Sequence, residues 1–320
     1  MLDGQGDRRA ATDHYQQAVT IFRETGDQWA LTHPLCDLAL RTWDAGHLHQ
    51  AMALLRECLA VFRQLRSHGG IDMVLGYLTF MAVTVGDLDG ATRTAEEKAE
   101  IGLVQALQAN RAYGLHSLAH VNLAQGRLDL ARQQLESALP IALAGDNHGF
   151  KAEVLLLLGR CAVYAGAADE AAARLAESQR WDASAEPAPW REAAILFGLG
   201  QVACLRSDFA GATARYQESL HLVRDIRPEI PPRLEGLAQA ALGQGQPERA
   251  ATLLAAADHL RMAIGAPVLP VDHPGMERLR QATAAALSGA AFHRAWASGQ
   301  ALSVDESVAY ALQPTERHDL

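Results

Sequence analysis

The sequence contains few residues of several types that often mark a function. Of its 28 basic residues only two are lysine, Lys98 and Lys151, a bias typical of a GC-rich genome. The formal charge is −9, and no basic stripe is present, which argues against direct contact with nucleic acid. The four cysteines are scattered without a CxxC pair, so we expect small buried residues in a reducing compartment: Cys36, Cys58, Cys161 and Cys204.

Motifs of membrane insertion, catalysis and cofactor binding are also missing. No apolar run approaches the length of a membrane span, and the first residues do not read as a signal peptide, which predicts a cytoplasmic protein. No phosphate-binding loop, H-E-x-x-H pattern or legible nucleophile–base pair occurs. We therefore predict no cofactor, no metal site, no catalytic residue and no enzymatic activity.

The chain instead contains a regular repeat. A small turn residue is followed five positions later by an alanine, seven times, with steps close to 40 residues. The turn residues are Gly6, Gly46, Gly86, Gly126, Gly166, Ser207 and Gly245, and the alanines are Ala11, Ala51, Ala91, Ala131, Ala171, Ala212 and Ala250. A fixed period of this length predicts stacked helix pairs in a solenoid.

The residues around each alanine place the two helices of a unit. A leucine followed by a small residue precedes each alanine after the first, and the small residue lies twelve positions before the alanine. A bulky residue lies four positions after the alanine, except in the unit with Ala95, and a small residue lies seven positions after it, except in the unit with Lys98. The last three positions share one helix face. The pattern resembles a tetratricopeptide repeat lengthened from 34 to about 40 residues. It predicts an all-α, right-handed superhelical solenoid of about seven helix pairs over residues 1–263.

Both ends depart from the repeat. The helix expected over 7–24 lacks a leading partner, which suggests either a fraying terminal helix or a piece of a longer protein. After residue 263 the repeat stops, and Asp272 is expected to cap a helix over about 274–287. A capping box, Ser303 to Glu306, opens the last helix. We expect residues 264–320 to form a helical cap and short tail. The aromatic side chains of the cap, Phe292 and Trp296, are expected to close the exposed end of the solenoid.

The tail also resembles a known family. RAATLLAAADHLRMAIGAP at 249–267 and AFHRAWASGQALSVDESVAYAL at 291–312 are similar to the end of the helical region of large ATP-binding bacterial regulators. These are the MalT-like and LuxR-type activators, in which an ATPase precedes the repeats and a DNA-binding domain often follows them. Neither domain is present here, so the resemblance implies the sensor and interaction part alone.

A binding groove is expected on the leading helices of the units. In repeats of this type a few positions of the leading helix line the concave surface, which suits a peptide or a small polar ligand better than a lipid. The predicted groove residues are Trp43, Phe80, Tyr113, His116, His120, Glu153, Arg160 and Gln201. Those of the third to fifth units are expected to converge on one ligand.

Several of these residues have a second interpretation. His116 and His120, at i and i+4, could hold a metal, contact a ligand or simply line the groove. Arg160 could pair with Glu153 instead of meeting a ligand. Trp181 and Trp190 frame a loop, either as a hydrophobic staple for the next unit, which we favour, or as a docking knob.

Three classes of function remain open at this point. The first is a ligand- or protein-sensing module of a bacterial transcriptional regulator, with ATPase or DNA-binding domains on a longer or separate chain. The second is a free-standing adaptor that binds a partner protein. The third, an enzyme using His116 and His120, has the least support. No class implies a membrane or direct nucleic-acid partner.

Overall fold

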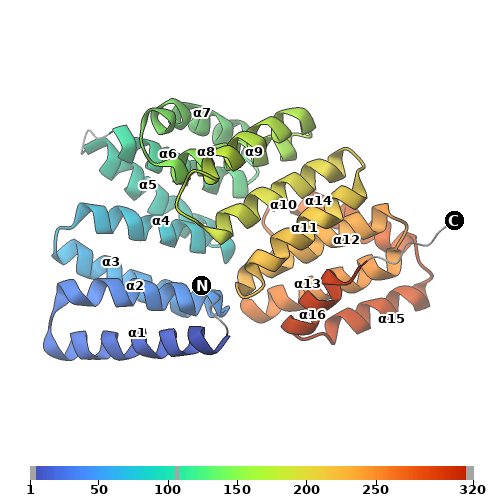
Figure 1. The fold of residues 1–320 in the computed structure, drawn as a ribbon, viewed down its shortest axis with the longest axis horizontal. Coiled ribbons are helices and arrows are strands. Elements are labelled where there is room, and N and C mark those ends of the chain that lie inside the picture. The colour runs from blue at the N-terminus through green and yellow to red at the C-terminus, as the bar shows by residue number, and fades with distance from the viewer. Residues whose placement is uncertain (1–4, 105–107, 315–320) are drawn as a thin grey trace. The chain divides into compact units, whose positions relative to one another are not determined.

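The chain folds into helices joined by short turns (Figure 1). The computed structural model describes residues 5–104 and 108–314, and in these residues it contains helices and no strand, which confirms the all-α prediction. The helices that carry the repeat are α1 (Gln5–Thr25), α2 (Gln28–Asp44), α3 (Leu48–Gln64), α4 (His68–Thr84), α5 (Leu88–Val104), α6 (Gln108–Ala124), α7 (Leu128–Ala144), α8 (His148–Tyr164), α9 (Ala168–Asp182), α10 (Pro189–Leu205), α11 (Phe209–Val223), α12 (Ile230–Gly243) and α13 (Pro247–Ile264). A 3₁₀ turn, Arg227–Glu229, precedes α12, and α14 (His273–Ala285), α15 (Gly289–Gln300) and α16 (Val304–Leu312) follow the repeats.

Backbone packing divides the chain into two compact units. Unit 1 comprises Met1–Ile141 with Ile264–Pro267, and unit 2 comprises Ala142–Ala263 with Val268–Leu320. Each unit is a stack of helix pairs, and we call α2, α4, α6, α8, α10 and α12 the leading helices. The division at residue 263 between repeats and cap follows the repeat pattern and stays a prediction, as does the handedness of the superhelix. In the described part of the chain, no helix combines the length and the apolarity that crossing a membrane needs.

The 40-residue period follows from the lengths of the elements. Helices α2 to α8 and α10 each have 17 residues, and three residues separate most neighbours, so two helices with their turns fill one period. In most of these turns the central residue has a positive φ, for example +85° at Gly46 and +78° at Gly126. The amide of Gly46 donates to the carbonyl of Trp43, and that of His47 donates to Thr42. This pair of bonds defines a Schellman motif, which explains the recurring glycine.

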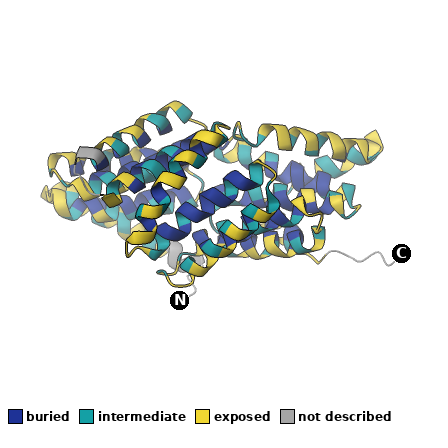
Figure 2. Cartoon of the chain, turned by 90° about the horizontal axis from the view of Figure 1, so that it is seen from above, coloured by how far each residue is buried: buried dark blue, intermediate teal, exposed yellow. Residues whose placement is uncertain are grey.

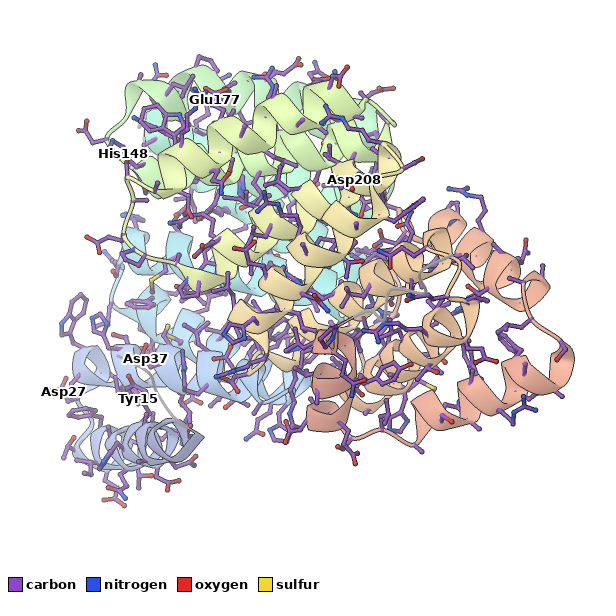
Figure 3. All side chains as sticks on the ribbon, turned by 45° about the vertical axis from the view of Figure 1, so that its right-hand side comes forward. Tyr15, Asp27, Asp37, His148, Glu177 and Asp208 are labelled. Atoms are coloured by element: carbon purple, nitrogen blue, oxygen red, sulfur yellow. The ribbon has the colours of Figure 1, made fainter. Side chains whose placement is uncertain are left out.

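The first predicted turn is wrong. Gly6 lies inside α1, so the chain has no turn at that position, although the expected helix over 7–24 is present. At the later turns the residue after the left-handed position often caps the next helix. Asp27 and Asp208, labelled in Figure 3 at the starts of α2 and α11, each accept a bond from the amide three residues on, at 2.9 Å.

Replacing Gly126 by alanine is expected to destabilise unit 1 by about 1 kcal/mol, because an L-residue pays that much in the left-handed region. No atom lies within 4 Å of the added Cβ, so the backbone alone sets the cost. Gly69, inside α4 and equally open, is the matched control, and its change to alanine should be neutral or stabilising. Urea unfolding followed by circular dichroism measures both. Equal effects of the two substitutions would contradict the turn geometry.

The repeat alanines mark close helix crossings, as the pattern predicts. Ala51, Ala91, Ala131, Ala171, Ala212 and Ala250 are all fully buried, while Ala11 on α1 is partly exposed. The bulky residue four positions later is buried beside them, and Leu55, Leu135, Leu175 and Tyr216 have no exposed area. In Figure 2 buried residues alternate with intermediate and exposed ones along the helices. A larger side chain at these alanines would overpack the crossing.

The position seven after the alanine has a second role that the pattern did not show. Its side chain reaches the carbonyl oxygen of the residue 26 positions earlier, on the leading helix. Ser178 donates to Ala152 at 2.7 Å and Ser219 to Ala193 at 2.6 Å. Cys58 approaches Thr32 in the same way at 3.5 Å, and Lys98 donates to Asp72 at 2.8 Å. Lys98 therefore makes the same hydrogen bond to the leading helix as the serines do, with a longer side chain. Ala95, three residues before it, is fully buried.

The C-terminal helices pack on the last repeats of unit 2. Trp296 and Val308 join the apolar cluster of α11 to α13, and the rings of Phe292 and Trp296 stack at 5.4 Å. The capping box is confirmed, because the Ser303 amide donates to Glu306 and the Glu306 amide to the Ser303 hydroxyl. Asp272 precedes α14 as expected, but its side chain makes no cap hydrogen bond.

Candidate binding surface

Three aromatic rings on successive leading helices of unit 1 form a row. The ring centroids of Trp43 on α2 and Phe80 on α4 lie 5.8 Å apart, and Phe80 stacks on His120 of α6 at 5.8 Å and 21°. Trp43 is only 4% exposed, His120 is partly exposed, and Phe80 is 39% exposed. We call these three residues the aromatic row. Its exposed member is a large apolar side chain held on both sides by other rings.

A buried charge pair lies on α4 and α5 next to this row. The Lys98 ammonium, 7% exposed, donates to the Asp72 carboxylate at 2.7 Å and stands 5.6 Å from the ring centre of Tyr113. An added Cβ on Gly76 would lie 3.4 Å from the same ammonium. The ring of Tyr113 therefore already contacts a cation of its own unit, the Lys98 ammonium. The Lys98 end of this ion pair packs against α4 between Met73 and Phe80.

His116 and His120 are both partly exposed on α6. Among the described residues no group of three or more histidine, cysteine or acidic side chains has the arrangement that a metal ion needs. The stacking of His120 on Phe80 places this imidazole in the aromatic row. His116 lies one turn before it on the same helix.

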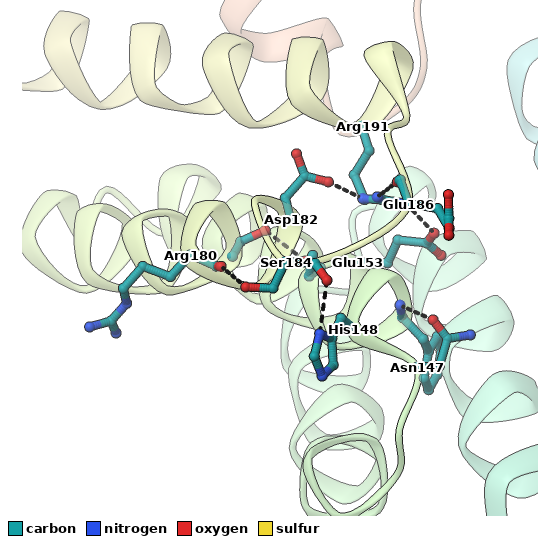
Figure 4. A network of polar contacts seen from close by, with 11 residues as sticks. Asn147, His148, Glu153, Arg180, Asp182, Ser184, Glu186 and Arg191 are labelled. Atoms are coloured by element: carbon teal, nitrogen blue, oxygen red, sulfur yellow. Dashed lines mark hydrogen bonds and ion pairs between the residues drawn. The ribbon is translucent and has the colours of Figure 1, made fainter.

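One predicted groove residue of unit 2, Glu153, lies in a polar network of that unit (Figure 4). Glu153 on α8 pairs at 3.8 Å with Arg191 on α10. The same guanidinium binds Asp182 and donates to the Glu186 carbonyl at 3.0 Å, and its side chain is 6% exposed. Glu153 thus belongs to a buried network that fastens the 183–188 loop between two repeats.

Arg160 and Gln201 are the other two predicted residues of unit 2. Arg160 hydrogen-bonds Tyr164, whose hydroxyl donates to Asp272 at 2.6 Å. Burial lowers the pKa of Arg160, but Tyr164 and Asp272 together raise it above its ordinary value. Burial, followed by the Asp272 carboxylate, raises the pKa of Tyr164. These contacts hold the segment before α14 against α8. Gln201 is partly exposed, and its buried Oε1 has no hydrogen-bond partner.

The two tryptophans of the 183–188 loop region have different surroundings. Trp181 packs on the Lys151 ammonium at 4.1 Å and on the ring of His148 at 5.1 Å, which fits a structural role. Trp190 is 49% exposed, with the Arg191 guanidinium 5.6 Å from its ring centre.

A hollow in unit 1 is lined by none of the predicted residues. It has a volume of about 580 Å³, is wide open to solvent, and is lined by Asp89, Thr92, Arg93, Gln125 and Arg127 of α5 and the α6–α7 turn. The predicted site residues are therefore surface and network residues, and not the lining of this hollow. Convergence of the unit 1 and unit 2 sets on one ligand stays a prediction.

Comparison with known proteins agrees with this architecture. A tetratricopeptide-repeat family model matches residues 110–180. The crystal structure of BtubC (BKLC) from P. vanneervenii superposes with a TM-score of 0.51 at 18% identity, covering 67% of this chain and 90% of that one. The protein has a helical solenoid fold built from tetratricopeptide-like pairs, a fold that commonly serves as a non-catalytic scaffold for binding proteins.

Sequence relatives come from mycobacteria. "Putative HTH-type transcriptional regulator Rv0890c" of Mycobacterium tuberculosis H37Rv is 27% identical over 315 residues, and a protein of Mycobacterium bovis, "Putative HTH-type transcriptional regulator Mb0914c", matches equally. The alignments cover 96% of this chain and 34% of each relative. The chain thus spans about a third of the length of these relatives.

Proposed function

We propose that this chain is the partner-binding sensor part of a bacterial transcriptional regulator. Support comes from the alignment with HTH-type regulators, which runs along 96% of the chain, and from the fold. The tail at 249–312 resembles the same class of proteins. In this proposal the repeats bind a protein or peptide signal, and ATP binding and DNA binding belong to other domains.

The observation that carries the proposed site is the exposed apolar face of α4. Met73 and Phe80, seven residues apart and so on one helix face, are 38% and 39% exposed. Phe80 is fixed between Trp43 and His120, so that burying it against a partner would cost little side-chain entropy. A rigid, exposed aromatic ring of this kind is the usual anchor of a protein interface.

A photo-crosslinking experiment tests the site. The photoreactive amino acid p-benzoylphenylalanine is placed at Phe80 in the source cell and the adducts are identified by mass spectrometry. Leu130 on α7, a second helix of the same unit, is 40% exposed and serves as the matched control position. We expect a defined protein adduct from position 80 and none from 130. The reverse outcome would place the partner on the opposite helices and refute the site.

If Phe80 anchors the interface, its removal should cause a large loss of affinity for the partner. Phe80→Ala is expected to weaken binding of the captured partner by about 10-fold or more, because truncating a central aromatic anchor has the largest effect at an interface. Leu130→Ala should leave affinity unchanged. Isothermal titration with the purified partner measures both. Helical content by circular dichroism should be unchanged in each, since Phe80 is not a core residue.

The regulator proposal has a separate test in the coding sequence. A nucleotide-binding ATPase in the same reading frame upstream would support a regulator. A reading frame that holds the repeats alone would instead support the free-standing adaptor.

A further inference from the structure

Two of the cysteines lie in direct contact in unit 1. The Sγ atoms of Cys36 on α2 and Cys58 on α3 are 3.1 Å apart, although 22 residues separate them in sequence. Cys36 is 6% exposed and Cys58 is fully buried. The other two cysteines belong to unit 2, where Cys204 approaches the hydroxyl of Tyr216 at 3.7 Å. None of the four cysteines is in a disulfide in this structure.

The packing of the α2–α3 hairpin causes this contact. Ala39 and Ala51 have no exposed area, so the two helices cross closely at small residues. Cys58 occupies the position seven after the repeat alanine, whose side chain points at the leading helix and meets the Thr32 carbonyl. Cys36 lies one helical turn after Thr32 on α2, which brings its sulfur to the Cys58 sulfur.

We propose that Cys36 and Cys58 form an oxidative modification site, at which hydrogen peroxide converts the two thiols into a disulfide joining α2 to α3. The Sγ atoms must close from 3.1 Å to about 2.05 Å, a movement of about 1 Å that side-chain rotation and a small helix shift supply. This inference is independent of the proposed function.

The reaction proceeds in two balanced steps. The Cys36 thiolate attacks one peroxide oxygen, forming an S–O bond and breaking the O–O bond, and hydroxide leaves and is protonated to water. Cys58 sulfur then attacks the sulfenic acid sulfur of Cys36, forming the S–S bond and breaking the S–O bond. Its thiol proton leaves with the hydroxide as a second water. The two thiols lose two electrons, and the peroxide gains them.

Cys36 is the better nucleophile of the pair. The hydrogen bond from the Cys58 thiol lowers the pKa of Cys36, while burial and the Asp37 carboxylate act in the opposite direction. That hydrogen bond raises the pKa of Cys58, and burial adds to the increase. Cys36 is also the less buried member of the pair, so in this proposal it is the thiol that meets peroxide first.

The disulfide would act on the leading helix that bears the aromatic row. Cys36 and Trp43 are seven residues apart on α2 and share a face, so a bond from Cys36 to α3 fixes the rotation of α2 beneath that ring. The cross-link closes a loop of about 20 residues, a length for which disulfides commonly raise stability.

Thiol counting and mass spectrometry of the oxidised chain test the inference. The 320-residue protein is treated with stoichiometric hydrogen peroxide, quenched with catalase and unfolded for titration of free thiols. We expect the loss of two thiols, a mass lower by about 2 Da, and a digest in which the Cys36 and Cys58 peptides are joined. The melting temperature should rise by about 2–8 °C, and dithiothreitol should reverse every change.

Single serine variants supply the controls. Cys58→Ser is expected to fold, since Ser178 and Ser219 occupy the equivalent position and donate to the equivalent carbonyl. This variant and Cys36→Ser should form no intramolecular disulfide, whereas the double variant Cys161→Ser, Cys204→Ser should oxidise like the original chain. Four remaining thiols after treatment, or Cys36 oxidised to sulfinic acid without a bond to Cys58, would overturn the inference.

Discussion

Replacing Arg191 by methionine is expected to lower the free energy of unfolding of unit 2 by about 3–5 kcal/mol. The guanidinium is 6% exposed and neutralises Asp182 while it also faces Glu153. Methionine fills a similar volume but leaves these carboxylates, which are 14% and 28% exposed, without their cation in a poorly hydrated place. Urea unfolding of the purified chain, followed by far-UV circular dichroism, measures the loss.

Arg206, the C-cap residue of the same helix, is the matched control for this change. Its ion pair with Asp169 has side chains that are 49% and 97% exposed, so water replaces the partner when the pair is broken. Arg206→Met should leave the unfolding midpoint within experimental scatter. A similar loss from both substitutions would mean that the buried network around Arg191 does not stabilise unit 2 more than a surface pair does.

Truncating Tyr216 to alanine is expected to cost about 3–5 kcal/mol, the usual range for a large buried aromatic ring. Tyr216 has no exposed area and its ring lies against Gly200 on α10 and Gly236 on α12. A Cβ at either glycine would come within 2.8 Å of the ring, so the two glycines form the slot that the ring fills. Removing the ring leaves a cavity between three helices, which thermal unfolding should report as a large fall in melting temperature.

Tyr216→Phe separates the ring from its hydroxyl. The hydroxyl contacts only the Cys204 sulfur among the polar contacts described, at 3.7 Å, so its loss should cost less than about 1 kcal/mol. A cost for phenylalanine as large as that for alanine would show that the hydroxyl, and not the fit of the ring, stabilises this position.

The same variant has an expected effect at alkaline pH. Burial raises the pKa of Tyr216 well above its ordinary value, so the folded state keeps the proton while the unfolded chain releases it above about pH 10. The stability from this group is complete below that pH and is lost as the pH rises further. Tyr216→Phe should therefore lose less stability than the original chain between about pH 10 and 11. Equal losses would contradict the buried state of the phenol.

The regular part of the fold could be predicted because its causes are local and recur. Each unit needs a residue that tolerates a positive φ in the turn, a small residue where the helices cross, and a bulky residue four positions later that fills the core. The wrong predictions concern residues whose structure is set by something other than their position in the repeat. Gly6 has the spacing of a turn, yet it lies in the first turn of α1. Asp272 has the chemistry of a cap, but Tyr164, 108 residues away, binds its carboxylate.

The candidate site was only partly accessible from the sequence. Position within the repeat placed Trp43, Phe80 and His120 on leading helices, and the structure brings their rings together. Pattern alone could not show which polar residues already have partners in their own unit, because those partners come from loops and second helices. Lys98 is instructive: it broke the pattern, and that exception was the one available signal of the buried pair with Asp72.

The burial of both lysines determines how the surface of the protein reacts with amine-directed reagents. Lys98 is held by Asp72, and Lys151 lies under the Trp181 ring, with 6% and 5% exposure. Among the described residues, the exposed basic side chains are consequently those of arginine and histidine. Acylating reagents, amine-coupled sensor chips and lysine-directed transferases find no lysine amine to attack until the helix pairs open. Acetylation of a lysine in these repeats would thus report unfolding of the unit that contains it.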